Sequence, residues 1–407
     1  MLRICMFVLL LVAACPEVFG QVQPEPTPNQ PAPAPKPASK KWYDIIKLSG
    51  YTQVRYNRLL ETNPDLGCEQ CDKSWGADNG FFIRRARLKF SGYLHEQVYF
   101  YIQTDFATSA GSNLHYGQLR DAYFDLGLDK KNAFRFRVGQ SKVPFGFENL
   151  QSSQNRLPLD RDDALNSAAP NERDLGVFFM YSPEVARQRF SELTKDGLRG
   201  SGDYGVFAFG AYDGQSANKP ELNDNRHFVA RLSYPFKLRN GQYIEPGIQA
   251  YTGKVRLLST SSGVKGTPKF EYDDQRVAAS LVVYPQPFGF QAEYNVGKGP
   301  EYNVALDSIE HSTLRGGYVM AHYNAYWKAQ LFSPFVRYQF FDGGKKHELD
   351  ARSYRVRDLE IGLEWQPHKN FELNATYTIS SRRYEDRALP INRQSGNLLR
   401  LQLQINY

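Results

Sequence analysis

Apolar and polar residues alternate at a spacing of two along most of this chain, and this alternation constrains the fold more than any other feature. In the last segment, Leu399, Leu401, Leu403, Ile405 and Tyr407 alternate with Arg400, Gln402, Gln404 and Asn406. Successive side chains of a β-strand point to opposite faces, so this strand has one largely aliphatic face and one wholly polar face. The pattern predicts an all-β protein built from two-faced strands.

Segments with this alternation follow one another from residue 46 onward. We count sixteen, at residues 46–57, 81–94, 98–108, 119–128, 133–141, 176–182, 204–212, 227–236, 242–255, 275–284, 289–298, 315–327, 331–341, 353–366, 371–381 and 397–407. An even number of antiparallel strands allows one chain to close its sheet into a barrel. Short connections such as 95–97 alternate with long ones such as 58–80 and 142–175, as in barrels with tight turns at one end and long loops at the other.

Composition decides between a soluble and a membrane-embedded β protein. Mean hydropathy is −0.54 although 14% of the 407 residues are aromatic. No apolar run beyond residue 20 approaches the roughly 18 residues of a membrane-spanning helix, and the aromatic content excludes a disordered chain. A soluble sandwich or propeller is the rival, but the apolar faces mix aliphatic side chains with Thr, Ala, Gly and Tyr, and no fixed-period repeat is present. We therefore predict a 16-stranded antiparallel transmembrane β-barrel that contacts outer-membrane lipid.

The N-terminal segment indicates export. Residues 1–20 combine Arg3, an apolar stretch and small residues, which is typical of a secretory signal peptide. Cleavage before Gln21 is the favoured interpretation, and lipidation of Cys15 after a lipobox-like sequence is the alternative. Seven prolines make 21–41 a predicted extended periplasmic linker, and 42–407 is the predicted barrel.

Two cysteines lie beyond the signal segment. Cys68 and Cys71 form a Cys-x-x-Cys sequence in the first long loop. A redox motif is expected between a strand and a helix start, and a metal site would call for nearby histidines. Neither is present, so a small disulfide that stiffens the loop is the favoured interpretation. We expect no cofactor and no metal.

Two further segments carry a family resemblance. The first is Gly80-Phe81-Phe82-Ile83-Arg84-Arg85-Ala86-Arg87-Leu88, and the second runs from Arg137 to Glu148 as RVGQSKVPFGFE. Together they resemble the phosphate-selective porin O and P family. The resemblance extends from about residue 48 to 407. It implies a trimeric sixteen-stranded porin in the outer membrane of a Gram-negative bacterium, with a long third loop, here 142–175, folded into the lumen.

A column of basic residues is predicted on one side of the lumen. Alternation places these side chains on the polar face of the first, second and fifth strands, at about 7 Å for each two-residue step: Lys47, Arg55, Arg85, Arg87, Lys89, Arg135 and Arg137. Guanidinium groups bind phosphate through paired donors, and Lys142 at the root of the inward loop adds a point charge. Ser152 and Ser153 of that loop offer hydroxyl donors. The resemblance implies that such residues bind small anions such as phosphate.

Acidic residues on the same faces leave the ion selectivity of the lumen undecided by the sequence. Nine acids are expected on the same polar faces: Asp105, Asp121, Asp125, Glu245, Glu293, Asp358, Glu360, Glu364 and Glu372. The predicted inward loop adds Asp160, Asp162, Asp163, Glu172 and Asp174, which could pair with or cancel the column. Phosphate preference, mild anion selectivity and a general pore therefore remain alternatives.

Other functions fit the sequence less well. No Gly-x-Ser-x-Gly or His-Glu-x-x-His motif occurs, so we do not expect an enzyme. The net charge of +7 does not indicate nucleic-acid binding, because the basic residues alternate with apolar ones at strand spacing. A plugged barrel with a structural or adhesive role is the remaining alternative to a channel for small hydrophilic solutes, since the long third loop could close the lumen.

Overall fold

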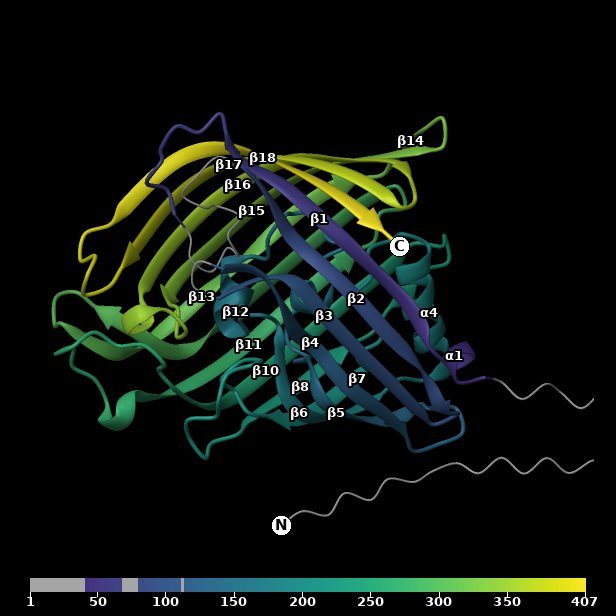
Figure 1. Cartoon of the computed structure of the whole chain (residues 1–407), viewed down its shortest axis with the longest axis horizontal. Helices are drawn as coiled ribbons and strands as arrows, with labels where there is room; N and C mark the ends of the chain where they lie inside the picture. The colour runs from purple at the N-terminus through teal and green to yellow at the C-terminus, as the bar shows by residue number, and fades with distance from the viewer. Residues whose placement is uncertain (1–40, 68–79, 111–112) are drawn as a thin grey trace, which may run out of the picture. The chain divides into compact units, whose positions relative to one another are not determined.

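The structure, a computed structural model, describes residues 41–67, 80–110 and 113–407 (Figure 1). Trp42–Tyr407 form one compact unit, whose strands belong to a single sheet. β1 (Lys47–Leu59) pairs with β2 (Phe81–His95) on one side and with β18 (Arg393–Asn406) on the other, so the sheet closes on itself. The predicted signal peptide, most of the predicted linker, Cys68 and Cys71 lie outside the described residues.

The barrel has the predicted sixteen strands, although two of them are interrupted. The strands between β2 and β10 are β3 (Val98–Ala110), β4 (Asn113–Gly127), β5 (Phe134–Lys142), β6 (Arg173–Tyr181), β7 (Phe207–Tyr212), β8 (His227–Ser233) and β9 (Phe236–Lys237). The others are β10 (Tyr243–Arg256), β11 (Glu271–Val283), β12 (Phe288–Asn303), β13 (Ser308–Tyr323), β14 (Ala325–Trp327), β15 (Gln330–Gly344), β16 (Ser353–His368) and β17 (Phe371–Glu385). β8 and β9 both pair with β10, and β13 and β14 both pair with β15, so each couple forms one barrel strand.

The polarity of the sheet is the reverse of that of a soluble protein. In β18 the side chains of Arg400 and Gln404 are almost fully buried, whereas Leu401 and Ile405 are 39% and 46% exposed. Large apolar side chains are exposed in the same way along most other strands. An apolar outer band around a polar interior is stable only where lipid replaces water outside.

Short turns join strands at one end of the barrel, and longer loops join them at the other. Two connections depart from this pattern. At the loop end, only residues 304–307 join β12 to β13, and at the short-turn end β6 and β7 meet through a helix, α4 (Glu184–Lys195). Its buried residues Ala186, Phe190 and Leu193 share one face at helical spacing. Two other short helical elements at the loop end are η1 (Pro268–Phe270) and η2 (Leu349–Ala351), and α1 (Trp42–Ile45) precedes β1. No described helix is long and apolar enough to cross a membrane.

The third loop lies inside the barrel. It joins β5 to β6 and contains α2 (Phe147–Leu150) and α3 (Asp163–Ala168), and nearly all its side chains are buried. Its apolar residues Val143, Phe145, Leu157, Leu165 and Ala168 pack against inward-facing side chains of β6, β7, β8, β10, β11, β13 and β15. The loop therefore occupies the side of the lumen that these strands line.

Candidate functional site

The wall of the lumen formed by β1 to β6 carries a ladder of basic side chains. β2, β3, β4 and β5 pair in this order and lie side by side (Figure 1). We use the name basic ladder for the lumen-facing cations of this wall: Arg85, Arg87, Lys89, Arg120, Arg135, Arg137 and Arg173. Because β2 runs from the long-loop end and β5 from the short-turn end, Arg85 lies near the outer mouth and Arg135 near the inner one.

The outer end of the ladder borders a cavity of about 230 Å³. Five guanidinium groups line it, those of Arg84, Arg85, Arg87, Arg120 and Arg161, against only two carboxylates. Both carboxylates are engaged: Asp105 accepts from Nε of Arg87 at 2.7 Å, and Glu172 lies 3.1 Å from Nε of Arg161. The cavity therefore carries excess positive charge.

Glu172 is the acid of the third loop that faces the ladder. It forms ion pairs with four cations: Lys142, Arg156, Arg161 and Arg173. Burial raises the pKa of its carboxyl group, but these positive charges outweigh burial and hold the pKa well below its ordinary value. Glu172 thus stays ionised and offsets one of the positive charges in the outer cavity.

The middle of the ladder joins the third loop through hydroxyl groups. The hydroxyl oxygens of Tyr51 and Ser153 are 2.6 Å apart, and Nη1 of Arg87 donates to both, at 2.8 and 3.2 Å. Lys89 donates to the side-chain carbonyl of Gln154 and lies 5.1 Å from the centre of the Tyr51 ring. At this level the ladder presents two cations, Arg87 and Lys89, whose contacts include neutral oxygens of the wall and the loop.

The inner end of the ladder combines arginine with tyrosine rings. Arg137 binds both carboxylate oxygens of Asp125, at 2.7 and 2.8 Å, and its guanidinium carbon lies 4.1 Å from the centre of the Tyr123 ring and 5.1 Å from that of Tyr204. Arg135 forms an ion pair of 2.9 Å with Asp203. Both arginines are almost fully buried.

The predicted site residues divide into two groups. Arg85, Arg87, Lys89, Arg135 and Arg137 lie along one wall, and Ser153 meets this wall as the sequence suggested. Ser152 is half-buried; its backbone carbonyl accepts a hydrogen bond from Asn155 N–H, and its side chain has no hydrogen-bond partner among the described residues.

Arg55 and Lys142 hold the third loop in place instead of completing the ladder. Nη2 of Arg55 donates to the carbonyl of Leu159 at 2.5 Å, and Nη1 pairs with Asp160 at 3.2 Å. The ammonium of Lys142 donates to three consecutive loop carbonyls, those of residues 149–151, at 2.7 to 3.3 Å. The positive charges of Arg55 and Lys142 therefore bind groups of the third loop and do not extend the ladder.

The remaining loop acids pair away from the ladder. Asp160 binds Arg400 as well as Arg55, and Asp163 binds Arg382 and Lys345. The side chain of Asp162 caps α3 by accepting from the backbone N–H groups of Ala164 and Leu165. Among the acids of the third loop, Glu172 alone therefore has a described ion pair with a ladder cation, Arg173. The other carboxylates that pair with the ladder belong to the barrel wall and to the segment after α4: Asp105, Asp121, Asp125 and Asp203.

Two further ladder residues were missed from the sequence. A register shift between Gln103 and Thr104 of β3 gives β4 an extra residue, so Arg120 and Asp121 are both buried although they are consecutive. Arg173 falls within the loop predicted at 142–175, because alternation is visible only from residue 176, but in the structure it begins β6 and pairs with Asp121 at 2.9 Å.

The third loop meets the segment after α4 inside the barrel. Nε2 of Gln151 donates to the carbonyl of Arg199 at 2.7 Å, and Nη2 of Arg199 pairs with Glu364 of β16 at 2.7 Å. Leu193 of α4 packs with Phe147 of the loop. These contacts fill the lumen away from the ladder. Among the described residues no group of three or more His, Cys, Asp or Glu side chains could hold a metal ion.

A closed sixteen-stranded barrel with an apolar outer band, a polar lumen and an inward third loop defines an outer-membrane porin. The chain belongs to the phosphate-selective porin O and P family, whose model matches residues 65–407. It is therefore a porin-family channel of the outer membrane, and this family consists of channels rather than enzymes.

Solved structures show the same fold at low sequence identity. The outer membrane channel DcaP of Acinetobacter baumannii has 15% identity and a TM-score of 0.54, covering 89% of this chain and 97% of that chain. The anion-selective porin from Comamonas acidovorans has 9% identity and a TM-score of 0.51, covering 89% and 99%. The trimer form of OmpT from Vibrio cholerae has 10% identity and a TM-score of 0.52, covering 89% and 100%. No curated protein matches the sequence.

Proposed function

We propose that this porin is an anion-selective channel that prefers phosphate, with the basic ladder as its path. The observation that carries the proposal is the outer cavity, where five guanidinium groups face two carboxylates that are already ion-paired. A narrow lumen keeps solutes close to its fixed charges, so a surplus of one sign selects ions of the other sign. Phosphate matches guanidinium through paired N–H donors.

The hydrogen-bond partners of the ladder cations support the stepwise passage of an anion from one cation to the next. Arg85 donates to the neutral side-chain oxygen of Gln53, and Arg120 donates to Gln118 and to Asn171 of the loop. Because the acceptors of Arg120 are uncharged, this cation keeps its attraction for an incoming anion. Lys89 and Arg137 continue the positive potential toward the inner mouth. An anion can then exchange one set of donors for the next.

The family name and the anion-selective relative agree with this proposal. The family is described as phosphate-selective, and the similar porin from Comamonas acidovorans is described as anion-selective. These descriptions apply to those proteins. For this chain the arrangement of charged side chains supports the same selectivity.

The zero-current potential across a planar bilayer tests selectivity. The purified porin is placed between two KCl solutions of different concentration, first without and then with millimolar phosphate. We expect a potential of anion-selective sign and a reduction of the chloride current by phosphate. A potential of cation-selective sign, or a chloride current that phosphate leaves unchanged, contradicts the proposal.

Matched variants locate the effect. Arg120→Gln removes one cation from the outer cavity without leaving a partner carboxylate unpaired, and we expect it to weaken phosphate block several-fold. Arg315→Gln removes the same charge from a side chain that is 61% exposed on β13 and should leave the block unchanged. Absence of any conductance would instead support a plugged barrel with a structural or adhesive role.

We also propose a homotrimer. The similar OmpT from Vibrio cholerae is described as a trimer form, and the exposed apolar side chains of this barrel would serve equally for contact with lipid or with a second copy. Mass measurement of the porin in detergent distinguishes a monomer from a trimer. A monomer mass at the concentrations used for bilayer work would overturn the trimer.

A further inference from the structure

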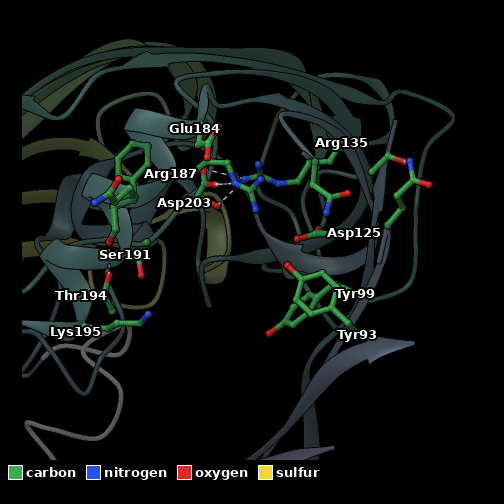
Figure 2. Close-up of a pocket in the computed structure, with 16 residues that line it drawn as sticks. Tyr93, Tyr99, Asp125, Arg135, Glu184, Arg187, Ser191, Thr194, Lys195 and Asp203 are labelled. Carbon is green, nitrogen blue, oxygen red and sulfur yellow. Dashed lines mark hydrogen bonds and ion pairs between the residues drawn. The ribbon is translucent and has the colours of Figure 1, made fainter. Parts of the chain in front are cut away.

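A second cavity, of about 620 Å³, lies at the inner end of the basic ladder. One side is formed by α4, and the other by the short-turn ends of β2, β3, β4 and β5 (Figure 2). Its volume falls within the range of cavities that bind small organic molecules. Since α4 departs from the short turns expected at this end, the barrel pattern alone does not account for this cavity.

Aromatic rings form one wall of the cavity. Tyr93 and Tyr99 lie on neighbouring strands with ring centroids 5.0 Å apart and planes at 56°. They face Ser191, Thr194 and Lys195 of α4 across the cavity (Figure 2). Tyrosine rings give a planar ligand a large contact area and attract its ring edges and faces.

A buried arginine with an unused donor lines the same cavity. Only 5% of the surface of Arg135 is exposed, and its Nη2 atom pairs with Asp203 at 2.9 Å. Its Nη1 atom has no hydrogen-bond partner among the described residues. A buried N–H donor without a partner costs free energy, and a ligand that accepts from it removes that cost.

The charges of the cavity favour an anion over a zwitterion. Each of its three carboxylates already has a cation: Asp125 has Arg137, Glu184 has Lys131, and Asp203 has Arg135. Arg187, which is 3.7 Å from Asp203, and Lys195 then supply additional positive charge. Arg135 and Arg187 both approach Asp203, so two guanidinium groups converge on one edge of the cavity (Figure 2).

We propose that this cavity binds aromatic carboxylates, with the carboxylate on Arg135 and Arg187 and the ring against Tyr93 and Tyr99. The cavity adjoins the inner end of the ladder, so the inference adds a class of organic anion to the solutes of the proposed channel and, as a solute site, rests on that function. Binding itself needs no conductance and can be measured separately.

Calorimetric titration of the full-length porin in detergent, with three carboxylates, tests the proposal. Benzoate carries the ring, cyclohexanecarboxylate has similar size without aromatic faces, and acetate has the charge alone. We expect benzoate to bind roughly three- to tenfold more tightly than cyclohexanecarboxylate and acetate to bind most weakly. Equal affinity for benzoate and acetate overturns the proposal.

Variants with matched controls test the arginines proposed to bind the carboxylate and the tyrosines proposed to contact the ring. Arg187→Gln and Tyr99→Leu should each weaken benzoate binding several-fold, and Arg135→Lys should do so while it keeps a positive charge beside Asp203. Arg189→Gln is the control for the first, because Arg189 also lies on α4 but contacts Pro235 and Tyr234. Tyr326→Leu, on the exposed β14, is the control for the second. Benzoate affinity that is unchanged in Arg187→Gln and Tyr99→Leu overturns the proposal.

The same samples separate this inference from the proposed function. Tight benzoate binding in a porin without anion selectivity supports the cavity and contradicts the channel proposal. Anion selectivity with phosphate block, but with benzoate no tighter than acetate, supports the channel and overturns the cavity.

Discussion

Arg337 of β15 and Glu148 of α2 form an ion pair of 2.8 Å inside the barrel, and both side chains are almost fully buried. Nε of Arg337 also pairs with Glu360 at 2.6 Å, and its Nη2 donates to the carbonyl of Asp160 at 3.0 Å. One guanidinium therefore joins the wall to two parts of the third loop. Since this loop fills the part of the lumen that faces the ladder and touches the ladder at Ser153 and Gln154, Arg337 helps to set the width of the proposed path.

Arg337→Met should release the third loop. It leaves the carboxylates of Glu148 and Glu360 buried without this partner, and breaking a buried pair in this way costs about 3 to 5 kcal/mol of stability. We expect lower resistance to unfolding by urea and a larger, noisier single-channel conductance. Val336→Ala, on the outer face of the same strand, is the control. Wild-type conductance and stability in Arg337→Met would show that the loop is held by other contacts.

Strong acid should release the same loop through Asp163. Burial raises the pKa of this carboxyl group, but Arg382 and Lys345 outweigh burial and lower it from its ordinary value of 3.8 to about 2. A carboxyl whose pKa is lower in the folded state contributes stability that is complete above the unfolded pKa and is lost as pH falls through the folded one. This contribution is about 2 kcal/mol.

Conductance measured from pH 5 down to pH 2 checks this linkage. We expect a constant value above about pH 4, where the pair is complete, and increasing fluctuation below it. Asp163→Asn should fluctuate at all these pH values and lose part of the acid dependence. An identical acid response in the wild type and in Asp163→Asn would assign the transition to other carboxyl groups.

The barrel and most of the ladder could be predicted because both depend on a local period of two. Arg85, Arg87, Arg135 and Arg137 lie in regular strands, so their orientation follows from alternation alone. Arg120 could not be found in this way, because a bulge in β4 turns two consecutive side chains inward. The same rule assigned Lys47 to the column, but Lys47 is exposed at the start of β1.

The alternation of residues along a strand could not predict which acid pairs with each inward-facing cation. Arg55 points inward as predicted, but the third loop brings Asp160 to it from about a hundred residues away in the chain. Only the folded loop shows which acids face the ladder and which face the opposite wall. The helix α4 could be predicted from the helical spacing of Ala186, Phe190 and Leu193, a pattern that differs from strand alternation.

Ser153→Ala should weaken phosphate block more than Ser152→Ala does. The Ser153 hydroxyl contacts both Tyr51 and Arg87 where the loop meets the ladder, whereas the Ser152 side chain has no hydrogen-bond partner among the described residues. Loss of one buried hydrogen-bonding group costs about 1 kcal/mol, which corresponds to a several-fold change in the phosphate concentration that halves the chloride current. Equal effects of the two substitutions would remove Ser153 from the proposed path.

Lys89→Glu should remove much of the anion selectivity of the ladder. Lys89 is half-buried beside Gln154 and Tyr51, and a carboxylate there would repel anions where the third loop meets the ladder. We expect the ratio of anion to cation permeability to fall several-fold in the zero-current measurement. Lys47→Glu makes the same change in charge at an exposed position and should have little effect. A similar fall in both variants would mean that net charge, rather than the ladder, sets selectivity.

Leu193→Ala should loosen the contact between α4 and the third loop. The Leu193 side chain is fully buried and packs with Phe147, Tyr243 and Tyr284. Removing it leaves a cavity at a cost of about 2 to 5 kcal/mol, and most of this cost should fall on the docking of α4 because the barrel strands keep their hydrogen bonds. Limited proteolysis of the connection between β6 and β7 should accelerate. Val185→Ala, at an exposed position of α4, should leave the cleavage rate unchanged, and an equal rate in both variants would mean that the helix docks through its polar contacts.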